Sequence, residues 1–441
     1  MRVLIISPEP WRKDNSFGNS YSSIFGKLNN IEIAHIYFLD GEPDYEPNVK
    51  RYYKISESEV MASVLLFWKK KVGAGCEILL SQKSDSFHSS VTKRSEQSLY
   101  KRLLSFGKRK HWSVLFNARE IAWRFGKINY DGMMGFVNDF KPDIIFLPYY
   151  HTYYTNRLAH YIKSRLDIPM VLEMAMDHYS LKRVSINVFF WVERFMKRAM
   201  IRKLVKESEM VFVISKKLKE EMERDLNIPC HILYKIPDES RAYHTYTTNN
   251  NGCIKYLFTG NIYANRWRSL AMLAEEIKRQ GGGKLDIYTA TPLTKEMDRA
   301  LNISGVSEVH SPVSSEEIII LQNGADVLVH AEAFDKFNKS LVRCAISTKI
   351  MDYLSAGRCI LTIGPSDISS VEYLAENNLA LNASSKEQLA EIVRNLNADN
   401  TIINCYAERG RAFALKELDP TMMRQALYDD LQSVINNFSH S

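Results

Sequence analysis

The stretch Ile346–Leu361 reads ISTKIMDYLSAGRCIL, and its pattern predicts a short helix followed by a buried strand. Ser347 is a residue type that often precedes the first turn of a helix, and Gly357 is one that often follows the last turn. The apolar residues of this helix would form its buried stripe: Ile350, Met351 and Leu354. Lys349 and Asp352, three residues apart, would share the other side.

The start of this helix has the composition of an anion site. Backbone N–H groups there lack partners within the helix, and the helix dipole favours a negative group. We therefore predict that Ser347, Thr348 and Lys349 bind a diphosphate, with Lys349 adding a full positive charge. Asp352, one turn later, is placed to accept hydrogen bonds from ribose hydroxyls. An ordinary capped helix with an exposed Lys–Asp pair is the alternative interpretation.

Short apolar runs alternate with longer helical patterns along the whole chain, which indicates an α/β fold with parallel sheets covered on both faces. Strands are expected at 3–7, 31–38, 143–147, 169–174, 210–214, 231–234, 255–259, 284–288, 326–329 and 359–363. Helices are expected at 154–164, 185–206, 216–226, 267–279, 314–323, 348–356 and 368–377, with two or three more from 386 to 437.

The chain of 441 residues is long enough for two domains of about 200 residues each. The polar segment Pro237–Gly252 lacks apolar periodicity, so we place the boundary there, between a first domain at 1–236 and a second at 253–419. Residues 420–441 are predicted to form a helix that crosses back to the first domain. Residues 40–112 look like an irregular, basic insertion: either a solvated, partly mobile loop with a helix or two, or a membrane-surface dock.

Composition narrows the class of protein. Hydrophobic residues make up 45% and charged residues 25%, as in a globular protein. The six cysteines form no C-x-x-C pair, so we expect free thiols in a reducing compartment. The apolar run at the N-terminus is too short for a signal peptide, and no stretch approaches the 18 or so uncharged apolar residues of a transmembrane helix. We therefore expect a cytoplasmic protein. The net charge of +7 predicts attraction to phosphorylated ligands or an anionic bilayer, whereas the interleaved aromatic and basic residues of RNA-binding proteins are absent.

Ser347–Leu361 closely resembles the nucleotide-sugar-binding signature of GT-B glycosyltransferases of the family 4-like (group 1) kind, which often reads S-T-K-x-x-[DE]-Y-L-A-x-G-[RK]-P-I-L. The stretch from Phe258 to Ile262, followed by Arg266, is similar to the strand–glycine–loop–basic element of that family. The resemblance implies two Rossmann-like domains that face each other across a cleft. It also implies that Gly260 lets the backbone approach the donor diphosphate and that Arg266, or Arg268 in its place, neutralises it.

The resemblance assigns the acceptor side to loops of the first domain. A glycine-containing loop at 17–20 would face the cleft through Gly18. Two polar clusters follow expected strands, and ligands of open α/β sheets gather at such strand ends. They place His151 near the acceptor and make Asp177 and His178 the candidate catalytic residues. A single histidine at a strand end is also commonly structural.

Cys359 stands where the family often has proline, a change that should not affect the chemistry, but another departure does matter. Many members carry a glutamate eight residues before the equivalent of Asp352, where it contacts the donor sugar. Here that position is Cys344, preceded by Arg343, and Glu332 lies farther upstream. The usual donor-sugar contact therefore cannot be transferred to this chain. The Asp-x-Asp motif of metal-dependent glycosyltransferases is also absent from the sequence, so we expect no metal ion and no cofactor besides the donor substrate.

The function that the resemblance implies is transfer of a sugar, of the hexosyl type, from a nucleotide diphosphate sugar to a hydroxyl of a glycan or lipid-linked acceptor. It further implies retention at the anomeric carbon and a setting in bacterial surface polysaccharide biosynthesis, at the inner face of the membrane. The basic amphipathic segment Phe189–Met200 is either a covering helix or a peripheral membrane contact. A non-catalytic scaffold that binds nucleotide sugar or glycan and a sugar-nucleotide epimerase stay open. A dehydrogenase is rejected because no G-x-G-x-x-G follows an early strand.

Overall fold

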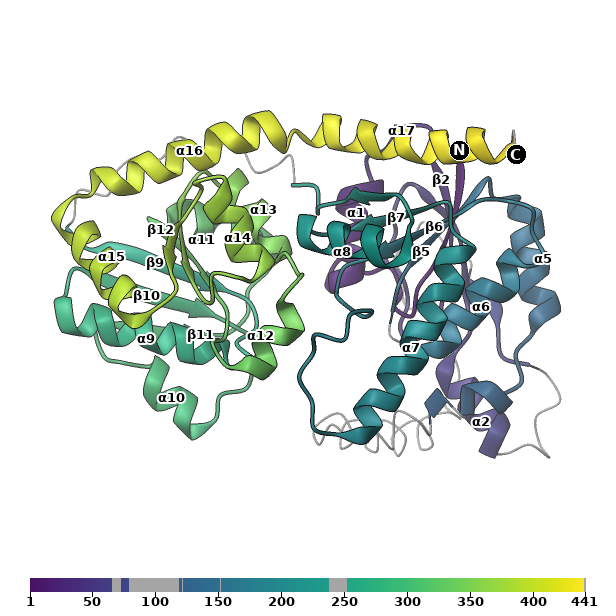
Figure 1. The fold of residues 1–441 in the computed structure, drawn as a ribbon, viewed down its shortest axis with the longest axis horizontal. Helices are drawn as coiled ribbons and strands as arrows, with labels where there is room; N and C mark the ends of the chain where they lie inside the picture. The colour runs from purple at the N-terminus through teal and green to yellow at the C-terminus, as the bar shows by residue number, and fades with distance from the viewer. Residues whose placement is uncertain (66–72, 79–118, 121, 151, 238–251, 440–441) are drawn as a thin grey trace, which may run out of the picture.

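The computed structural model describes residues 1–65, 73–78, 119–120, 122–150, 152–237 and 252–439. Two β-sheets organise these residues, one in each half of the chain (Figure 1). All strands of the first sheet precede Leu233, and all strands of the second begin at or after Ile254. The segment that we expected to link the domains lies almost entirely outside the described residues.

The first sheet has eight strands in the order β4-β3-β2-β1-β5-β6-β7-β8, and all neighbours are parallel except β3 and β4. Its strands are β1 (Arg2–Ile6), β2 (Glu32–Tyr37), β3 (Val49–Lys54), β4 (Cys76–Ile78), β5 (Ile144–Pro148), β6 (Met170–Met174), β7 (Met210–Val213) and β8 (Cys230–Ile232). Strand order reverses direction between β1 and β5, which is where ligands bind at the carboxyl ends of such sheets.

Helices cover both faces of the first sheet, because successive strand residues point to opposite sides. Leu4 and Ile6 belong to a core with α2, α5, α6, α7 and α8, whereas Val3 and Ile5 pack with α1 and α17. The bounds of the helices in this half are α1 (Ser16–Phe25), α2 (Glu57–Leu65), α5 (Tyr130–Phe140), α6 (Tyr153–Lys163), α7 (Val188–Lys206) and α8 (Lys216–Leu226).

The second sheet has six parallel strands in the order β11-β10-β9-β12-β13-β14. Its strands are β9 (Ile254–Thr259), β10 (Gly283–Tyr288), β11 (Ser307–His310), β12 (Val327–Ala331), β13 (Cys359–Ile363) and β14 (Leu381–Ala383). One face packs against α9 (Arg266–Gln280), α10 (Lys295–Leu301) and α15 (Lys386–Ala398). The other packs against α11 (Ser315–Gly324), α13 (Thr348–Ser355), α14 (Ser369–Glu376) and α16 (Thr401–Glu417), and α12 (Lys336–Val342) precedes α13.

The last helix, α17 (Pro420–Ser439), extends from the second half back over the first sheet, so that the two chain ends lie near each other (Figure 1). Its buried residues Leu427, Leu431 and Val434 join the core that contains Val3 and Ile5. His231 Nδ1 lies 2.9 Å from Asp430 Oδ2, which adds a polar contact to the same junction. The chain therefore passes between its two halves twice.

Two predictions about local structure were wrong. Residues 17–20 belong to helix α1 and not to a loop, because Asn15 caps that helix by accepting a 2.7 Å hydrogen bond from the Gly18 N–H. Part of the region 40–112 is regular: β3 and β4 extend the first sheet, and α2 packs beneath it. Positions 66–72 and 79–112 of that region lie outside the described residues.

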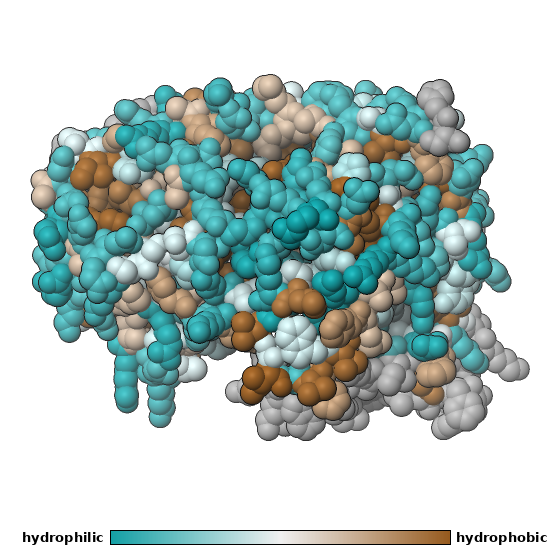
Figure 2. Space-filling model, in the orientation of Figure 1, coloured by the Kyte–Doolittle hydropathy of each residue, from teal (hydrophilic) through white to brown (hydrophobic). Residues whose placement is uncertain are grey.

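In the described ranges, no helix combines the length and the apolar character that are needed to cross a bilayer. All six cysteines are free thiols, as expected. The visible surface is mostly hydrophilic, but apolar side chains gather at the lower edge, where α7 begins (Figure 2).

Candidate functional site

The strand order of the second sheet reverses between β9 and β12, and the chain leaves these strands at Gly260 and Glu332. Gly260 has φ +128°, a conformation that side chains rarely adopt. A Cβ atom at this position would lie only 1.8 Å from the Lys349 ammonium nitrogen. Glycine is therefore required for Lys349 to lie over the end of β9. The structure thus brings together two residues that the sequence analysis assigned to the diphosphate from separate motifs.

Lys349 lies in the first turn of α13, partly buried, with its nitrogen 4.9 Å from the centre of the Phe258 ring. Among the described residues, its ammonium group has neither a hydrogen bond nor an ion pair. Burial, together with the nearby Arg266, lowers the pKa of Lys349 to about 8, against the opposing effects of Glu332 and Asp352. This is a desolvated cation without a compensating anion, which is an unfavourable state that a bound anion would relieve.

Arg266 lies beside this lysine at the first position of α9 and is held by Glu332. The guanidinium donates hydrogen bonds of 2.9 and 3.1 Å to the two carboxylate oxygens of Glu332, and a third of 3.1 Å to Asn261 Oδ1. Glu332 is therefore a positioning residue for Arg266 in this structure. Arg268, the substitute that the sequence suggested, instead donates to Glu296 at 3.3 Å and lies outside the cluster.

We call Gly260, Arg266, Glu332 and Lys349 the β9–α13 cluster. Its two cations face one carboxylate, so one positive charge is uncompensated. Ser347 occupies the N-cap position of α13 as predicted, but its hydroxyl makes no capping hydrogen bond, so the capping role is wrong. Thr348 is exposed beside it. The Ser347 hydroxyl makes no hydrogen bond to the first turn of α13, so it and the N–H groups of that turn can bind a ligand.

Asp352, one turn farther along α13, contacts the first half of the chain. Its two carboxylate oxygens lie 3.0 and 2.9 Å from the ammonium group of Lys235, which follows β8. Both side chains are only 11% exposed. The proposed ribose acceptor is therefore engaged in an ion pair across the two domains. Sequence analysis missed Lys235, because the pairing depends on how the domains meet and leaves no local pattern.

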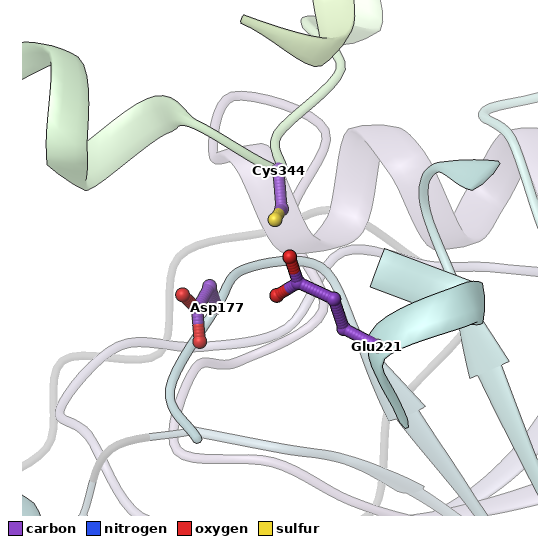
Figure 3. Close-up of side chains that lie close together, drawn as sticks. All are labelled: Asp177, Glu221 and Cys344. Atoms are coloured by element: carbon purple, nitrogen blue, oxygen red, sulfur yellow. The ribbon is translucent and has the colours of Figure 1, made fainter. Parts of the chain in front are cut away.

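A second group of charges lies where the Arg343–Cys344 segment meets the first domain, and we call it the Arg343 junction. Figure 3 shows Asp177 and Glu221 of this group beside Cys344. Arg343 donates hydrogen bonds of 2.9 Å to Asp177 and 2.7 Å to each carboxylate oxygen of Glu221. Cys344 is fully buried in the core of the first domain, and its carbonyl accepts a 2.7 Å hydrogen bond from the Ser215 hydroxyl. The position that usually carries a sugar-binding glutamate thus serves domain packing here.

Asp177, one of the two candidate catalytic residues, already accepts several hydrogen bonds. Besides Arg343, it accepts hydrogen bonds from the Ser180 N–H at 2.8 Å and from Arg194 at 3.1 Å. Burial would raise the pKa of Asp177, but hydrogen bonds from Ser180 and Arg343 outweigh it and lower the pKa to about 2. A carboxylate in this state is a poor proton acceptor, so the structure assigns it to the junction rather than to proton transfer.

Asp177, Glu221 and Cys344 also place three potential metal-ligand atoms, two carboxylate oxygens and one sulfur, within 4.8 Å of one another (Figure 3). Arg343 already pairs with both carboxylates, and burial raises the pKa of the Cys344 thiol to about 12. A metal ion would have to displace the guanidinium and deprotonate this thiol. The chemistry of the group therefore fits an ion-pair junction better than a metal site.

The remaining candidates are spread over the first domain. The ring of His178 lies 5.3 Å from that of Tyr149, at the carboxyl edge of the first sheet. Gly18 is in close contact with a neighbouring loop, because a Cβ there would lie 2.0 Å from the Arg12 carbonyl oxygen. His151 lies outside the described residues. One further group was not predicted: Glu173, at the end of β6, accepts a 2.8 Å hydrogen bond from the Tyr21 hydroxyl, and burial raises its pKa to about 7.

No protein-family model and no curated protein matches this sequence. Solved structures do match across nearly the whole chain. Sucrose-phosphate synthase from Thermosynechococcus elongatus is 9% identical, with 100% of each chain covered and a TM-score of 0.63. Anabaena Alr3699/HepE in complex with UDP is 9% identical, with 98% of this chain and 100% of that chain covered and a TM-score of 0.60. WaaG, a glycosyltransferase involved in lipopolysaccharide biosynthesis, is 12% identical, with 97% of this chain and 99% of that chain covered and a TM-score of 0.55. At such identities the likeness concerns the fold, which is the two-domain GT-B fold.

Proposed function

We propose that this chain is a glycosyltransferase that moves a sugar, of the hexosyl type, from a nucleotide diphosphate sugar to a hydroxyl of a glycan or lipid-linked acceptor. The observation that carries the proposal is the unpaired Lys349 ammonium, which lies over Gly260 and beside Arg266. These groups converge at the reversal point of the second sheet, together with the start of α13. A diphosphate suits such a site, because it carries the negative charge that the site lacks.

The chemistry follows from where charge develops. As the bond from the sugar to the diphosphate breaks, negative charge grows on the leaving phosphate, and fixed cations stabilise that charge without reorganisation. Arg266, held in place by Glu332, and Lys349 would provide this stabilisation. Two side-chain cations and a helix start supply what a divalent metal supplies elsewhere, so we propose metal-independent transfer. Retention at the anomeric carbon is what the resemblance implies.

Solved structures with this fold suggest which donor to test first. Anabaena Alr3699/HepE was solved in complex with UDP, and another protein of similar fold, from E. coli, was solved with UDP-2-fluoro glucose bound. We therefore propose a UDP-sugar as the first donor. The involvement of WaaG in lipopolysaccharide biosynthesis supports a setting in surface polysaccharide synthesis, at the cytoplasmic face of the membrane.

The second candidate function is a non-catalytic protein that binds nucleotide sugar and acts as a scaffold. Cys344 favours it, because this residue is buried against Asp177 and Glu221 where the resembled family carries a sugar-binding glutamate. Donor binding without turnover across a panel of acceptors is the outcome expected for the scaffold. An epimerase would instead turn over the donor at a rate that acceptors do not change.

The test is thermal unfolding of the purified chain with UDP, GDP, ADP and their sugars, with and without Mg²⁺. A nucleotide at 100 times its Kd should add about 2.7 kcal/mol of apparent stability. We expect a shift with one nucleotide that persists in EDTA and is lost in Lys349→Ala. Lys278→Ala, an exposed lysine near the end of α9, is the matched control and should keep the shift. No shift with any nucleotide contradicts the proposal.

A further inference from the structure

The beginning of α7 and the loop before it expose a set of large apolar side chains to solvent. Ile186 is completely exposed, and the exposed fractions of the others range from 52% to 72%. We call this set the apolar α7 face, and its members are Ile186, Val188, Phe189, Val192, Phe195 and Met196. Figure 2 shows a group of apolar side chains at the corresponding edge of the molecule.

Helical spacing places these side chains on one side of α7. Val188, Val192 and Phe195 follow one another at intervals of four and three residues, which is the spacing of one helix face. The face that packs on the first domain is formed by other residues: Arg194, Ile201, Leu204 and Val205. The helix is therefore anchored mainly through its second half, while its first turns direct an apolar surface outward. Contiguous apolar surface of this kind marks an interaction site in a globular protein.

The charges around this face are almost all positive. Between Leu181 and Lys206 the chain has eight basic residues and a single acidic residue, Glu193. The basic ones are Lys182, Arg183, Arg194, Lys197, Arg198, Arg202, Lys203 and Lys206. Glu193 pairs with Lys197, Lys182 pairs with Glu221, and Arg194 is buried against Asp177. The exposed cations that have no ion pair among the described residues are Arg202, Lys203 and Lys206. Trp191, a residue type favoured at the boundary between lipid and water, lies within the same turns.

We propose that the apolar α7 face docks on an anionic lipid bilayer, with its apolar side chains among the lipid headgroups and acyl chains and its cations on the headgroup phosphates. An amphipathic helix with Phe and Trp on one side and Lys and Arg beside it has the composition of an interfacial helix. A second copy of the chain fits less well. It would bring the exposed cations of two copies together, Arg202, Lys203 and Lys206 of each, and like charges oppose such a contact.

The apolar α7 face lies close to the Arg343 junction, so docking would also affect how an acceptor reaches the enzyme. This step rests on the proposed function. Leu181 directly follows Ser180, whose carbonyl accepts a 2.8 Å hydrogen bond from Arg194 and whose N–H donates to Asp177 at the Arg343 junction. The docked helix would thus hold the junction between the two domains close to the bilayer. A lipid-linked acceptor could then reach the enzyme without leaving the membrane.

The experiment is sedimentation of the full chain with sucrose-loaded vesicles of phosphatidylcholine alone or with about one third phosphatidylglycerol, without donor or acceptor. The variant is Phe189→Ser/Phe195→Ser, and the control is Ile320→Ser/Met422→Ser, which removes two similarly exposed apolar side chains elsewhere. All four positions are exposed, so melting temperatures should be unchanged. We expect binding only to anionic vesicles, weakened at least about tenfold in the variant and unchanged in the control.

Three outcomes would overturn the proposal. One is a wild-type chain that stays in the supernatant with anionic vesicles. Another is a variant that sediments as well as the control. The third is a wild-type dimer in light scattering, without lipid, that becomes a monomer in the variant, since it would assign the face to a second copy. Because the vesicles carry neither donor nor acceptor, the result does not depend on transfer activity, and the nucleotide shift reports separately on the donor site.

Discussion

Two groups of charged side chains in this protein contain the same residue types but differ in whether every cation has a carboxylate partner. At the Arg343 junction, Asp177 and Glu221 surround the guanidinium, and Lys182 and Arg194 complete the pairing. In the β9–α13 cluster, Arg266 and Lys349 share the single carboxylate of Glu332. The junction joins two domains, and each of its three cations has a carboxylate partner. The cluster lies at the reversal point of one sheet, and among the described residues the Lys349 ammonium has no ion-pair partner.

The pairing of the cations separates a structural role at the junction from a binding role at the cluster. A buried charge set that is fully paired stabilises only the arrangement that pairs it, and breaking one member leaves the others desolvated. A set that contains a cation without an ion-pair partner is more stable with a ligand of opposite sign. The same logic explains why Asp177, a candidate for catalysis on sequence grounds, is better placed to hold the domains together.

The largest effect should follow Arg343→Ala. This change leaves Asp177 and Glu221 without their shared cation, and removing one partner of a buried pair costs about 3 kcal/mol or more. Chemical denaturation should show a lower midpoint for the variant. Arg268→Ala removes an exposed pair with Glu296 and should change stability by less than about 1 kcal/mol. Equal midpoints for the two variants would mean that the junction does not join the domains.

Lys349→Met should have the opposite effect: little change in stability but a large loss of nucleotide affinity. Its ammonium is desolvated and has no ion-pair partner in the described part of the chain, so replacing it with an apolar side chain of similar length should leave the denaturation midpoint unchanged or raise it. Nucleotide affinity should fall about 10- to 100-fold, because a charged hydrogen-bond donor is lost. Calorimetric titration with the nucleotide found in the thermal screen measures this change. A variant that binds the nucleotide as tightly as wild type would remove Lys349 from the donor site.

Acid should weaken the Arg343 junction through Asp177. Its pKa is lowered from 3.8 to about 2 in the folded chain, so its contribution is complete above pH 4 and is lost as pH falls towards 2. That contribution is about 2 kcal/mol. The free energy of unfolding of wild type should therefore exceed that of Asp177→Asn at pH 5, and the difference should shrink by pH 2.5. A difference that stays constant over this range contradicts the assigned pKa.

Sequence alone predicted the elements whose signals are local. Every strand we expected is present, and the α13 motif and the glycine after β9 lie together as the family resemblance implied. The short strands β3, β4, β11 and β14, at or next to the sheet edges, were missed, since a strand of three to six residues between loops has little apolar periodicity. Helix α1 was missed because its serines, asparagines and Gly18 are typical of a loop.

The partners of the site residues could not be predicted, because they come from distant parts of the chain. Glu332 reaches Arg266 only through the pairing of β9 with β12. Lys235 reaches Asp352, and Arg343 reaches Asp177, only after the two domains meet. Burial also decides the charge state of such groups, and it depends on the complete fold. The sequence therefore identified the cations of the proposed donor site without showing which of them are already paired.

The last prediction concerns the pH dependence of nucleotide binding, which should come from the β9–α13 cluster alone. The pKa of Lys349 is lowered to about 8, and only its protonated form attracts a diphosphate. Affinity should be level from pH 6 to 7.5 and then fall by up to about tenfold for each pH unit above 8. Lys349→Arg keeps the charge at all these pH values and should bind with a flat profile. If the arginine variant binds but shows the same decline as wild type, another group is titrating. The asymmetry between a paired and an unpaired set of charges then cannot rest on Lys349.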